Sequence, residues 1–208
     1  GTTSNPYSLS GLSAGTAYDF YVQDDCGGGS QSLWSGPCSF TTVCDVVNTF
    51  PWTEDFENGG NRPDCWTEEY NVGSHGWMFQ DGGDIYPLNA HSGSYNAAFI
   101  HENTSSSTKL ITPPLDLSAL TNPQISFWHA QLEYNYFGTI YQDELRVYYK
   151  TSSDGVWTLI PGAEYTTQVA DWTEVVLSLP NPSTEYYIAF EGTDGDGQGV
   201  CIDDVEVD

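Results

Sequence analysis

Positive charge is almost absent from this sequence. Its 208 residues include 4 Lys and Arg against 29 Asp and Glu, which gives a formal net charge of −25 at pH 7. Binding to nucleic acid or to an anionic lipid surface needs clustered basic side chains. The basic residues are scattered along the chain, at Arg62, Lys109, Arg146 and Lys150. The composition therefore argues against nucleic acid and anionic membranes as partners.

Long apolar runs are also missing. No stretch approaches the roughly 18 apolar residues that cross a bilayer, so we expect no membrane insertion. Hydrophobic residues nevertheless make up 38% of the chain and aromatic residues 14%. Disordered acidic chains are poor in aromatics, so this content predicts a packed core.

Metal-binding cysteine and histidine motifs are absent as well. The sequence has five cysteines but no CxxC or HxxxH spacing, which disfavours a zinc site. A glycine-rich turn lies between Cys26 and Cys38, and we expect these two to pair, with Cys44 bonded to Cys65. Cys201, in an apolar strand, is then a buried thiol. Disulfides favour an oxidising compartment, so we expect a secreted or cell-surface protein.

Strand patterns dominate what is present. Several segments rich in β-branched and aromatic residues are bounded by Gly, Pro, Asn and Ser, and no window sustains a helical apolar stripe. Their spacing of about ten residues predicts an all-β, antiparallel sandwich. The clearest segments are residues 17–23, 124–129, 144–150, 174–179 and 185–191.

Residues 1–43 differ in composition from the rest. The order Leu, Gly-Thr, Tyr, Trp-Ser and Phe-Thr-Thr in LSGLSAGTAYDFYVQDDCGGGSQSLWSGPCSFTT resembles the C-terminal half of a fibronectin type III domain. The resemblance places Tyr18 at the tyrosine corner and Phe40 on the last strand. About forty residues are too few for a sandwich of roughly 100, so we expect a partial module whose apolar face needs a partner.

Residues 44–208 form a second predicted domain. The series FPWTEDFENGGNRPDCWTEE, HSGSYNAAF, KLITPPLDLSAL, QISFWHAQ and VCIDDVEV resembles the MAM and cleaved-adhesin families, including gingipain adhesin modules. The resemblance implies an antiparallel jelly-roll β-sandwich, often calcium-bound. It also implies adhesion or glycan binding without catalysis.

The resemblance also implies a calcium site. In a jelly roll the first and last strands commonly lie side by side, which would bring EDFE near IDDVEV and the loop His91-Ser92-Gly93. The candidate metal ligands are Asp55, Glu57, Asp81, His91, Ser92, Asp203 and Asp204, with Glu54 and Asp84 nearby in sequence. Carboxylate and carbonyl oxygens are the ligands that Ca²⁺ prefers. The alternative is that these acids are solvated surface residues.

A second acidic stretch, TDGDGQG, carries Asp194 and Asp196 between glycines. It is similar to the first half of an EF-hand loop, but the closing Glu is missing. We therefore expect a polar hairpin tip between Glu191 and Cys201.

Catalytic patterns are weak. Some β-sandwich glycosidases place two carboxylates about a sugar bond, but EDFE is only a fragment of their signature. The sequence has no GxSxG motif, and its four histidines show no partner pattern. We expect a protein that is not an enzyme.

Aromatic side chains supply the candidate ligand site. The stretch LEYNYFGTIYQ places several rings in a probable loop, where they could stack on sugar faces. The candidate ligand-binding residues are Trp77, Tyr86, Tyr134, Tyr136, Phe137 and Tyr141. The alternative is that these rings cap the open end of the sandwich. The other tryptophans with strand-like surroundings are expected mostly in the core: Trp52, Trp66, Trp128, Trp157 and Trp172.

These features together predict a calcium-stabilised, non-catalytic adhesion or carbohydrate-binding module of a larger secreted bacterial protein. The acidic surface favours a neutral glycan. The alternative is a module that binds a cell-surface protein or other modules of its parent polypeptide, or a structural or processing domain beside a secreted protease or glycoside hydrolase.

Overall fold

The chain is built from β-strands. The computed structural model describes residues 6–100 and 105–208, and the regular secondary structure in these ranges is β-strand. Contacts divide the chain into two compact units, Gly1–Asp45 and Val46–Asp208. Within the described ranges, no helix is long and apolar enough to cross a membrane. The prediction of an all-β protein is confirmed.

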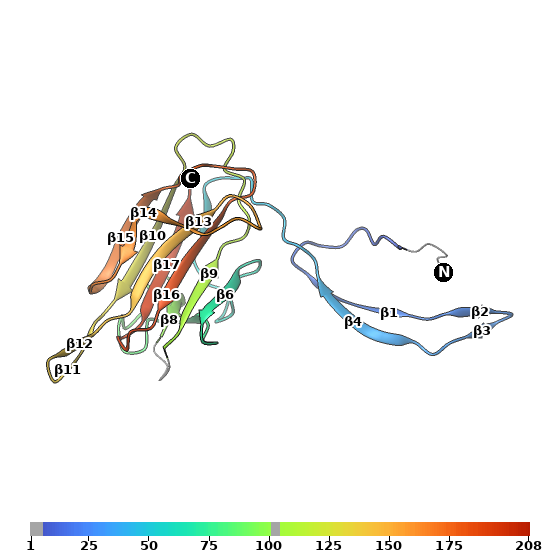
Figure 1. Cartoon of the computed structure of the whole chain (residues 1–208), viewed down its shortest axis with the longest axis horizontal. Helices are drawn as coiled ribbons and strands as arrows, with labels where there is room; N and C mark the ends of the chain where they lie inside the picture. The colour runs from blue at the N-terminus through green and yellow to red at the C-terminus, as the bar shows by residue number, and fades with distance from the viewer. Residues whose placement is uncertain (1–5, 101–104) are drawn as a thin grey trace. The chain divides into compact units, whose positions relative to one another are not determined.

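The first unit is a long antiparallel hairpin (Figure 1). Strand β1 (Ala17–Val22) pairs with β4 (Ser35–Thr41), and β2 (Asp25–Gly27) pairs with β3 (Ser30–Gln31) at the tip. The ring of Tyr18 stacks on Phe40 with centroids 5.9 Å apart. The Tyr18 hydroxyl accepts a hydrogen bond from the Ser13 N–H at 2.9 Å. These contacts hold the open end of the hairpin.

The predicted Cys26–Cys38 disulfide is wrong. Both cysteines are free and exposed. Cys38 lies opposite Phe20 in the β1–β4 ladder, whereas Cys26 lies in β2, six residues further toward the tip. Six residues of strand span about 20 Å, which is far beyond the reach of a disulfide. The glycine-rich segment forms the end of an extended ribbon and does not bring its two cysteines together.

The second unit is a sandwich of two antiparallel sheets, visible as the two layers on the left of Figure 1. The six-stranded sheet has the order β15-β10-β17-β8-β7, with β5 also paired to β17. Its strands are β5 (Trp52–Glu54), β7 (Met78–Gln80), β8 (Asn96–Phe99), β10 (Gln124–Gln131), β15 (Val169–Ser178) and β17 (Val200–Val207). The five-stranded sheet has the order β14-β13-β16-β9-β6. Its strands are β6 (Thr67–Val72), β9 (Ser107–Ile111), β13 (Glu144–Lys150), β14 (Thr158–Tyr165) and β16 (Tyr187–Thr193).

The first and last strands of this unit lie side by side, as expected for a jelly roll. Strand β5 pairs antiparallel with β17 in the register Glu54–Val205 and Trp52–Val207. Strand β17 is central, because β10 flanks it on the other side. This pairing brings the EDFE segment next to IDDVEV.

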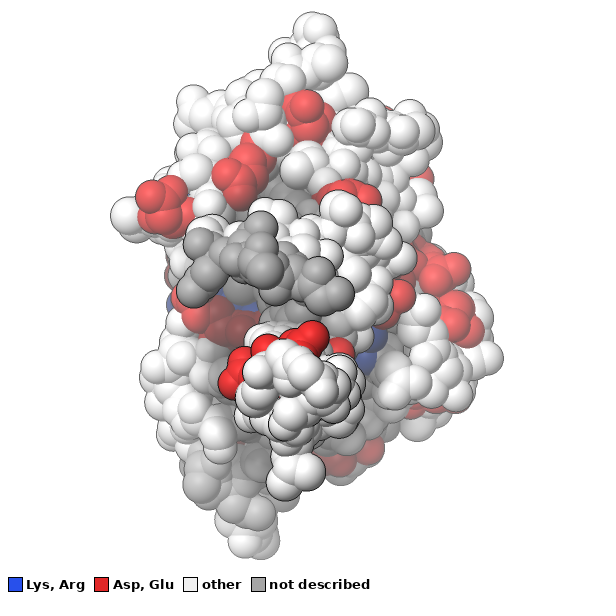
Figure 2. Space-filling model, turned by 90° about the vertical axis from the view of Figure 1, so that its right-hand side faces the viewer, with Lys and Arg blue, Asp and Glu red and all other residues white. Residues whose placement is uncertain are grey.

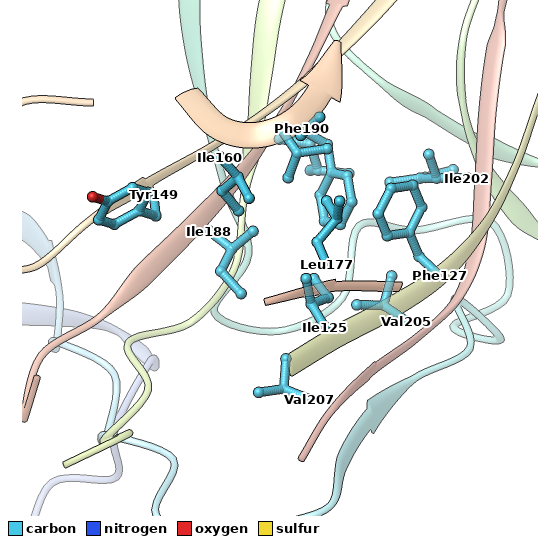
Figure 3. Close-up of a cluster of buried hydrophobic side chains, with 14 of the residues drawn as sticks. Ile125, Phe127, Tyr149, Ile160, Leu177, Ile188, Phe190, Ile202, Val205 and Val207 are labelled. Carbon is cyan, nitrogen blue, oxygen red and sulfur yellow. The ribbon is translucent and has the colours of Figure 1, made fainter. Parts of the chain in front are cut away.

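The core lies between the two sheets (Figure 3). Phe127 and Ile202 come from the six-stranded sheet, and Ile188 and Phe190 come from the five-stranded sheet; all four are fully buried. Phe127 and Phe190 meet edge to face, with centroids 5.1 Å apart. Strand β13 shows the alternating burial that places one face in this core, whereas the first four residues of the central strand β17 are all buried.

The tryptophans are divided between core and surface. Trp66 is buried, and Trp52 packs partly buried against the core. Trp128, Trp157 and Trp172 are only half-buried, so the expectation that they belong to the core is wrong. Each has a surface contact instead: a ring stack for Trp128 and indole N–H bonds for the other two.

The remaining cysteines behave as expected. Cys44 and Cys65 form the predicted disulfide. Cys201 in β17 is fully buried and free. Burial raises the pKa of its thiol, so the thiol stays protonated and unreactive.

His129 gives the core a pH dependence. Its side chain in β10 is buried against Tyr165, with ring centroids 4.5 Å apart, and burial lowers its pKa to about 4. The unfolded chain, with a histidine pKa of about 6.5, therefore binds the proton first as the pH falls. The stability that neutral His129 contributes should be complete above pH 6.5 and lost between about 6.5 and 4. Melting curves should show wild type losing stability relative to His129→Leu across this interval, and a constant difference would contradict the assignment.

Candidate functional site

A cleft lies at one end of the sandwich. It has a volume of about 470 Å³. Three segments distant in sequence line it, namely residues 84–85, the β11–β12 hairpin and the loop between β16 and β17. We call it the tyrosine cleft, and its lining residues are Asp84, Ile85, Tyr134, Tyr136, Tyr141, Asp196, Gly197 and Gln198.

A short hairpin carries the three tyrosines. Strand β11 (Tyr134–Tyr136) pairs with β12 (Thr139–Tyr141), and this ribbon extends beyond the sheets in Figure 1. Tyr134 lies directly opposite Tyr141, and Tyr136 is two residues further along, so all three side chains project from one face. The ring centroids of Tyr136 and Tyr141 are 6.1 and 6.2 Å from that of Tyr134. The hairpin therefore offers a row of aromatic rings along one wall of the cleft.

The tip of this hairpin holds an exposed phenylalanine. Phe137 and Gly138 form a two-residue turn in which both residues have positive φ, 50° and 89°, as a type I′ turn requires. Asn and Gly favour this turn, whereas a bulky residue at positive φ is strained. Phe137 is 93% exposed and its ring touches that of Tyr136 at 4.7 Å between centroids. The backbone is therefore strained at Phe137 although the ring is not buried.

The exposures of the two hairpin rings argue against the alternative that these rings cap the core. Tyr136 is 53% exposed and Tyr134 40%. Their removal would leave no internal cavity.

The loop that forms the opposite wall is built around Asp143. This residue is 1% exposed and directly precedes β13. Its carboxylate accepts hydrogen bonds from the N–H groups of Gly195, Gly197 and Gly199. Burial raises the pKa of Asp143, and the three N–H bonds oppose that shift.

The glycines of this loop are required by close contacts. A Cβ on Gly195 would lie 2.2 Å from the Gln142 carbonyl oxygen, and one on Gly197 would lie 2.7 Å from the Asp143 backbone nitrogen. The segment connects β16 of one sheet to β17 of the other, so the expectation of a hairpin tip is wrong. The alternating glycines serve to wrap the backbone around a buried carboxylate.

A second group of predicted residues meets beside β17. The pairing between β10 and β17 shifts by one residue at Asp203–Glu206, and Asp204 has a φ of 46°. Consecutive strand residues normally point to opposite faces, but this β-bulge lets Asp203 and Asp204 reach the same loop. Asp203 accepts the backbone N–H groups of His91 and Ser92. Asp204 contacts His91 Nδ1 at 2.6 Å and accepts from Ser92 Oγ at 2.8 Å.

Glu57 contacts the same loop. Its Oε1 accepts the N–H groups of Ser94 and Tyr95, and a Cβ on Gly93 would collide with it. Asp55 accepts the N–H of Glu57, and it shares a small cavity of about 140 Å³ with Asp204. We call Asp55, Glu57, His91, Ser92, Asp203 and Asp204 the acidic cluster.

Asp81 lies outside the acidic cluster. It accepts hydrogen bonds from the Ala90 N–H and, at 3.4 Å, from Asn89, so it closes its own loop. Among the described residues, no three His, Cys, Asp or Glu side chains are already arranged to hold a metal ion. Burial raises the pKa of Asp203 to about 7, and Asp204 adds to the shift.

Three predicted ligand-binding residues do not line the tyrosine cleft, namely Trp77, Tyr86 and Phe137. Trp77 is 6% exposed, and its indole N–H donates to the Thr108 carbonyl, so its expected place beside the ligand is wrong. Its position just before β7 turns it into the core. Tyr86 donates its hydroxyl to Asp171 at 3.1 Å and does not line the cleft.

Sequence reasoning missed several residues of the cleft. Ile85, Gly197 and Gln198 were not singled out, and Asp84 and Asp196 were considered only as metal ligands. Asp143, which holds the wall, was not considered. The alternating glycines of DGDGQG were the available signal, because they indicate a backbone packed closely on another group.

Several solved structures are similar to this chain, and they include cleaved adhesin domains and a carbohydrate-binding module. The K1 cleaved adhesin domain of Lys-gingipain from Porphyromonas gingivalis W83 matches with a TM-score of 0.58 and 22% identity, covering 77% of this chain and 98% of that one. The K2 cleaved adhesin domain of Lys-gingipain matches with a TM-score of 0.55 and 18% identity, covering 76% and 98%. A carbohydrate-binding module, TmCBM61 in complex with β-1,4-galactotriose, matches with a TM-score of 0.50 and 18% identity, covering 74% and 93%.

No protein-family model matches the sequence, and no curated protein matches it. At these identities the likeness concerns the fold. It confirms the resemblance to cleaved adhesins at that level, an antiparallel β-sandwich.

Proposed function

We propose that this protein is a non-catalytic glycan-binding module and that the tyrosine cleft is its binding site. The observation that carries the proposal is the row of three tyrosine rings facing a polar wall across one cleft. Sugars present apolar C–H faces to aromatic rings while their hydroxyl groups bond to polar side chains. The shared fold with adhesin and carbohydrate-binding modules agrees with this proposal.

The geometry of the cleft suits a short oligosaccharide. Ring centroids about 6 Å apart along the hairpin form a platform on which successive sugar units can stack. A volume of about 470 Å³ lies within the range of small-molecule sites. The apolar surface continues onto Phe137, which is 93% exposed and touches the ring of Tyr136.

A glycan array followed by calorimetric titration of the best ligand tests the proposal, with β-1,4-galactotriose among the probes. Tyr136→Ala should weaken binding by about 1 kcal/mol or more, since exposed aromatic rings carry much of the energy at such surfaces. Its melting temperature should stay near that of wild type because the ring is half-exposed. Tyr70→Ala is the matched control, a tyrosine 49% exposed on β6. Equal losses in both variants, or no glycan bound at millimolar concentration, would refute the proposal.

We also propose that the acidic cluster holds a calcium ion. Apart from the His91 ring, its side chains offer hard oxygen atoms, which Ca²⁺ prefers, and the raised pKa of Asp203 marks a carboxylate that a cation would stabilise in its ionised form. Glu57, Asp203 and Asp204 are the residues that would hold it, with Asp55 beside them. The ion would tie β5, the loop 91–95 and β17 together.

Chelation tests the calcium proposal. A ligand that binds only the folded state stabilises it by mass action, so excess chelator should lower the melting temperature by several degrees. Asp204→Asn should remove this dependence, whereas Asp81→Asn, outside the acidic cluster, should keep it. Identical melting curves with calcium and with chelator would show that these acids are structural hydrogen-bond acceptors only.

The first unit favours a second role in protein interaction. Phe20, Tyr21 and Val22 on β1 are 42%, 52% and 57% exposed, and both edges of the β1–β4 ladder are open. We propose that this fibronectin type III-like unit pairs with other modules of its parent polypeptide, or with a cell-surface protein, in a secreted or cell-surface setting. Phe20→Ser should weaken such a complex in pull-down experiments with neighbouring modules and leave glycan binding unchanged.

A further inference from the structure

The hairpin of the first unit has one apolar face and one polar face. Tyr18 lies opposite Phe40 in the β1–β4 ladder, and the ring centroids of Phe20 and Phe40 are 6.2 Å apart on the same face. The residues between them point to the other face, where Ser39 Oγ donates to Asp19 Oδ1 at 2.6 Å. Phe20 is nonetheless 42% exposed. The hairpin therefore carries a face of core composition that stays partly open.

The outer edge of β1 has free backbone groups. The Thr42 N–H donates to the Thr16 carbonyl at 3.0 Å, so these residues form a hydrogen-bonded pair just beyond the ends of the strands. Such pairs alternate with pairs whose backbone groups point outward, which directs the N–H and C=O groups of Ala17 and Asp19 away from β4. Among the described residues, β1 pairs only with β4, and no other backbone hydrogen bond is made to Ala17 or Asp19. This edge can therefore accept a further strand.

The outer edge of β4 is less suited to a further strand. Ser39 directs its backbone groups outward, but Pro37, the next outward position, has no N–H to donate. Strand β4 also contains a β-bulge, because Gly36 and Pro37 together lie opposite the single residue Tyr21. Proline and bulges are devices that block pairing at an edge. The geometry favours β1 as the docking edge.

Charge favours a basic binding partner. Residues 1–45 contain four acidic residues and no Lys or Arg, and the whole chain has a net charge of −25. The four are Asp19, Asp24, Asp25 and Asp45. Figure 2 shows acidic side chains spread over one face of the molecule, with few basic ones. A second copy of this chain would be repelled, whereas a Lys or Arg opposite Asp19 would form a favourable cross-strand pair.

From these features we infer that the first unit binds an extended segment of alternating apolar and basic residues, which pairs with the outer edge of β1 as a third strand. This inference rests on the proposed protein-interaction role of the unit and names the chemistry of its partner. The apolar residues of the segment cover Phe20 and its neighbouring rings. The basic residues lie on the other face, beside Asp19 and the 52% exposed ring of Tyr21. Backbone hydrogen bonds supply affinity, and the alternation supplies specificity.

The direct test uses synthetic peptides of about nine residues, a usual strand length. A labelled peptide in which Val alternates with Lys is titrated into the whole chain at low ionic strength, and binding is followed by fluorescence anisotropy. It should bind about tenfold more tightly than the peptide in which Glu replaces Lys, because the charge interaction changes sign. It should also bind more tightly than a peptide of the same composition whose valines form one block, since that peptide has no apolar strand face.

Amide hydrogen exchange shows which edge is used. With the alternating Val–Lys peptide bound, the N–H groups of Ala17 and Asp19 should exchange about tenfold more slowly, because they then donate to the added strand. The N–H groups of Ser39 and Thr41, on the edge of β4, should keep their rates. Protection at Ser39 and Thr41 without protection at Ala17 and Asp19 would overturn the assignment to β1.

Two substitutions separate the charged and the apolar contributions. Asp19→Asn keeps an acceptor for Ser39 Oγ and should weaken binding of the alternating Val–Lys peptide severalfold. Asp45→Asn removes an exposed carboxylate of the same unit outside the hairpin and should leave binding unchanged. Phe20→Ser should abolish binding, whereas Leu33→Ser, at a 92% exposed residue outside both strands, should not. Equal effects of each variant and its control would contradict the inference.

The outcomes separate this inference from the role on which it rests. The inference fails if the three peptides bind equally or if the alternating Val–Lys peptide does not bind at millimolar concentration. The interaction role then stands when a neighbouring module still forms a complex that Phe20→Ser weakens. If neither a peptide nor a neighbouring module binds the first unit, both the inference and the proposed role fail.

Discussion

Asp143→Ala should lower the free energy of unfolding by about 3 kcal/mol or more and abolish ligand binding in the tyrosine cleft. The substitution leaves the N–H groups of Gly195, Gly197 and Gly199 without their acceptor. Each unsatisfied buried donor costs about 1–3 kcal/mol, although water entering the site would reduce the total. The loop carrying Asp196 and Gln198 would lose its support, so binding should fail even below the melting temperature. Thermal unfolding and calorimetric titration measure the two effects.

Asp116→Ala is the control for this experiment. Asp116 also accepts a backbone N–H, from Ser118, but this hydrogen bond is exposed. The control should cost less than about 1 kcal/mol, because water replaces an exposed acceptor easily. If Asp143→Ala costs no more than Asp116→Ala, the carboxylate is not what holds the wall of the cleft.

Phe137→Asn should change stability and affinity in opposite directions. Asn-Gly is the preferred sequence for a type I′ turn, so relief of the positive φ at Phe137 should stabilise the protein by about 1 kcal/mol. Loss of the exposed ring beside Tyr136 should weaken glycan binding about fivefold to tenfold. We expect a residue that strains the backbone and packs little inside the protein to serve an external contact.

Val156→Asn provides the comparison. Val156 is 85% exposed in the loop before β14, so its replacement also removes an exposed apolar side chain. It should alter neither affinity nor melting temperature appreciably. If Phe137→Asn binds the glycan as tightly as wild type does, Phe137 is not part of the binding site.

Much of the fold was predictable because it depends on short-range pattern. Alternation in ELRVYYK places Leu145 and Val147 in the core, and the structure confirms it. The pairing of the first strand of the sandwich with the last followed from the jelly-roll resemblance. The aromatic segment 134–141 stood out because its rings exceed what an ordinary loop carries, although it was expected as a loop and forms a two-stranded hairpin.

Features that depend on exact register were not predictable. Trp77 and Tyr134 both stand at segment boundaries, and only the fold shows that one ring is buried and the other faces the cleft. The glycine-rich segment between Cys26 and Cys38 suggested that these two cysteines meet. In the β1–β4 ladder, however, Cys38 lies opposite Phe20, so the two cysteines do not face each other. The bulge that brings Asp203 and Asp204 to one loop has no clear sequence signal.

The role of Asp143, which holds the loop at the cleft, was not predictable from the sequence for a related reason. Asp143 lies more than fifty residues from the glycines that it binds, and a single Asp before a strand is unremarkable in sequence. Asp143 directly precedes β13 and the glycines directly follow β16, so the contact arises only once these two strands pair, with Glu144 opposite Thr193. The chemistry of the site could therefore be anticipated from composition, while its geometry required the structure.

Mapping a bound glycan by backbone NMR tests the central claim most directly. The whole chain is titrated with the best glycan from the array, and shifts of the amide resonances are followed. We expect the largest shifts at residues 84–85, 134–141 and 196–198, which line or flank the tyrosine cleft. Shifts concentrated elsewhere, for example around Trp128 and Trp172 on the outer face of the six-stranded sheet, would contradict the account.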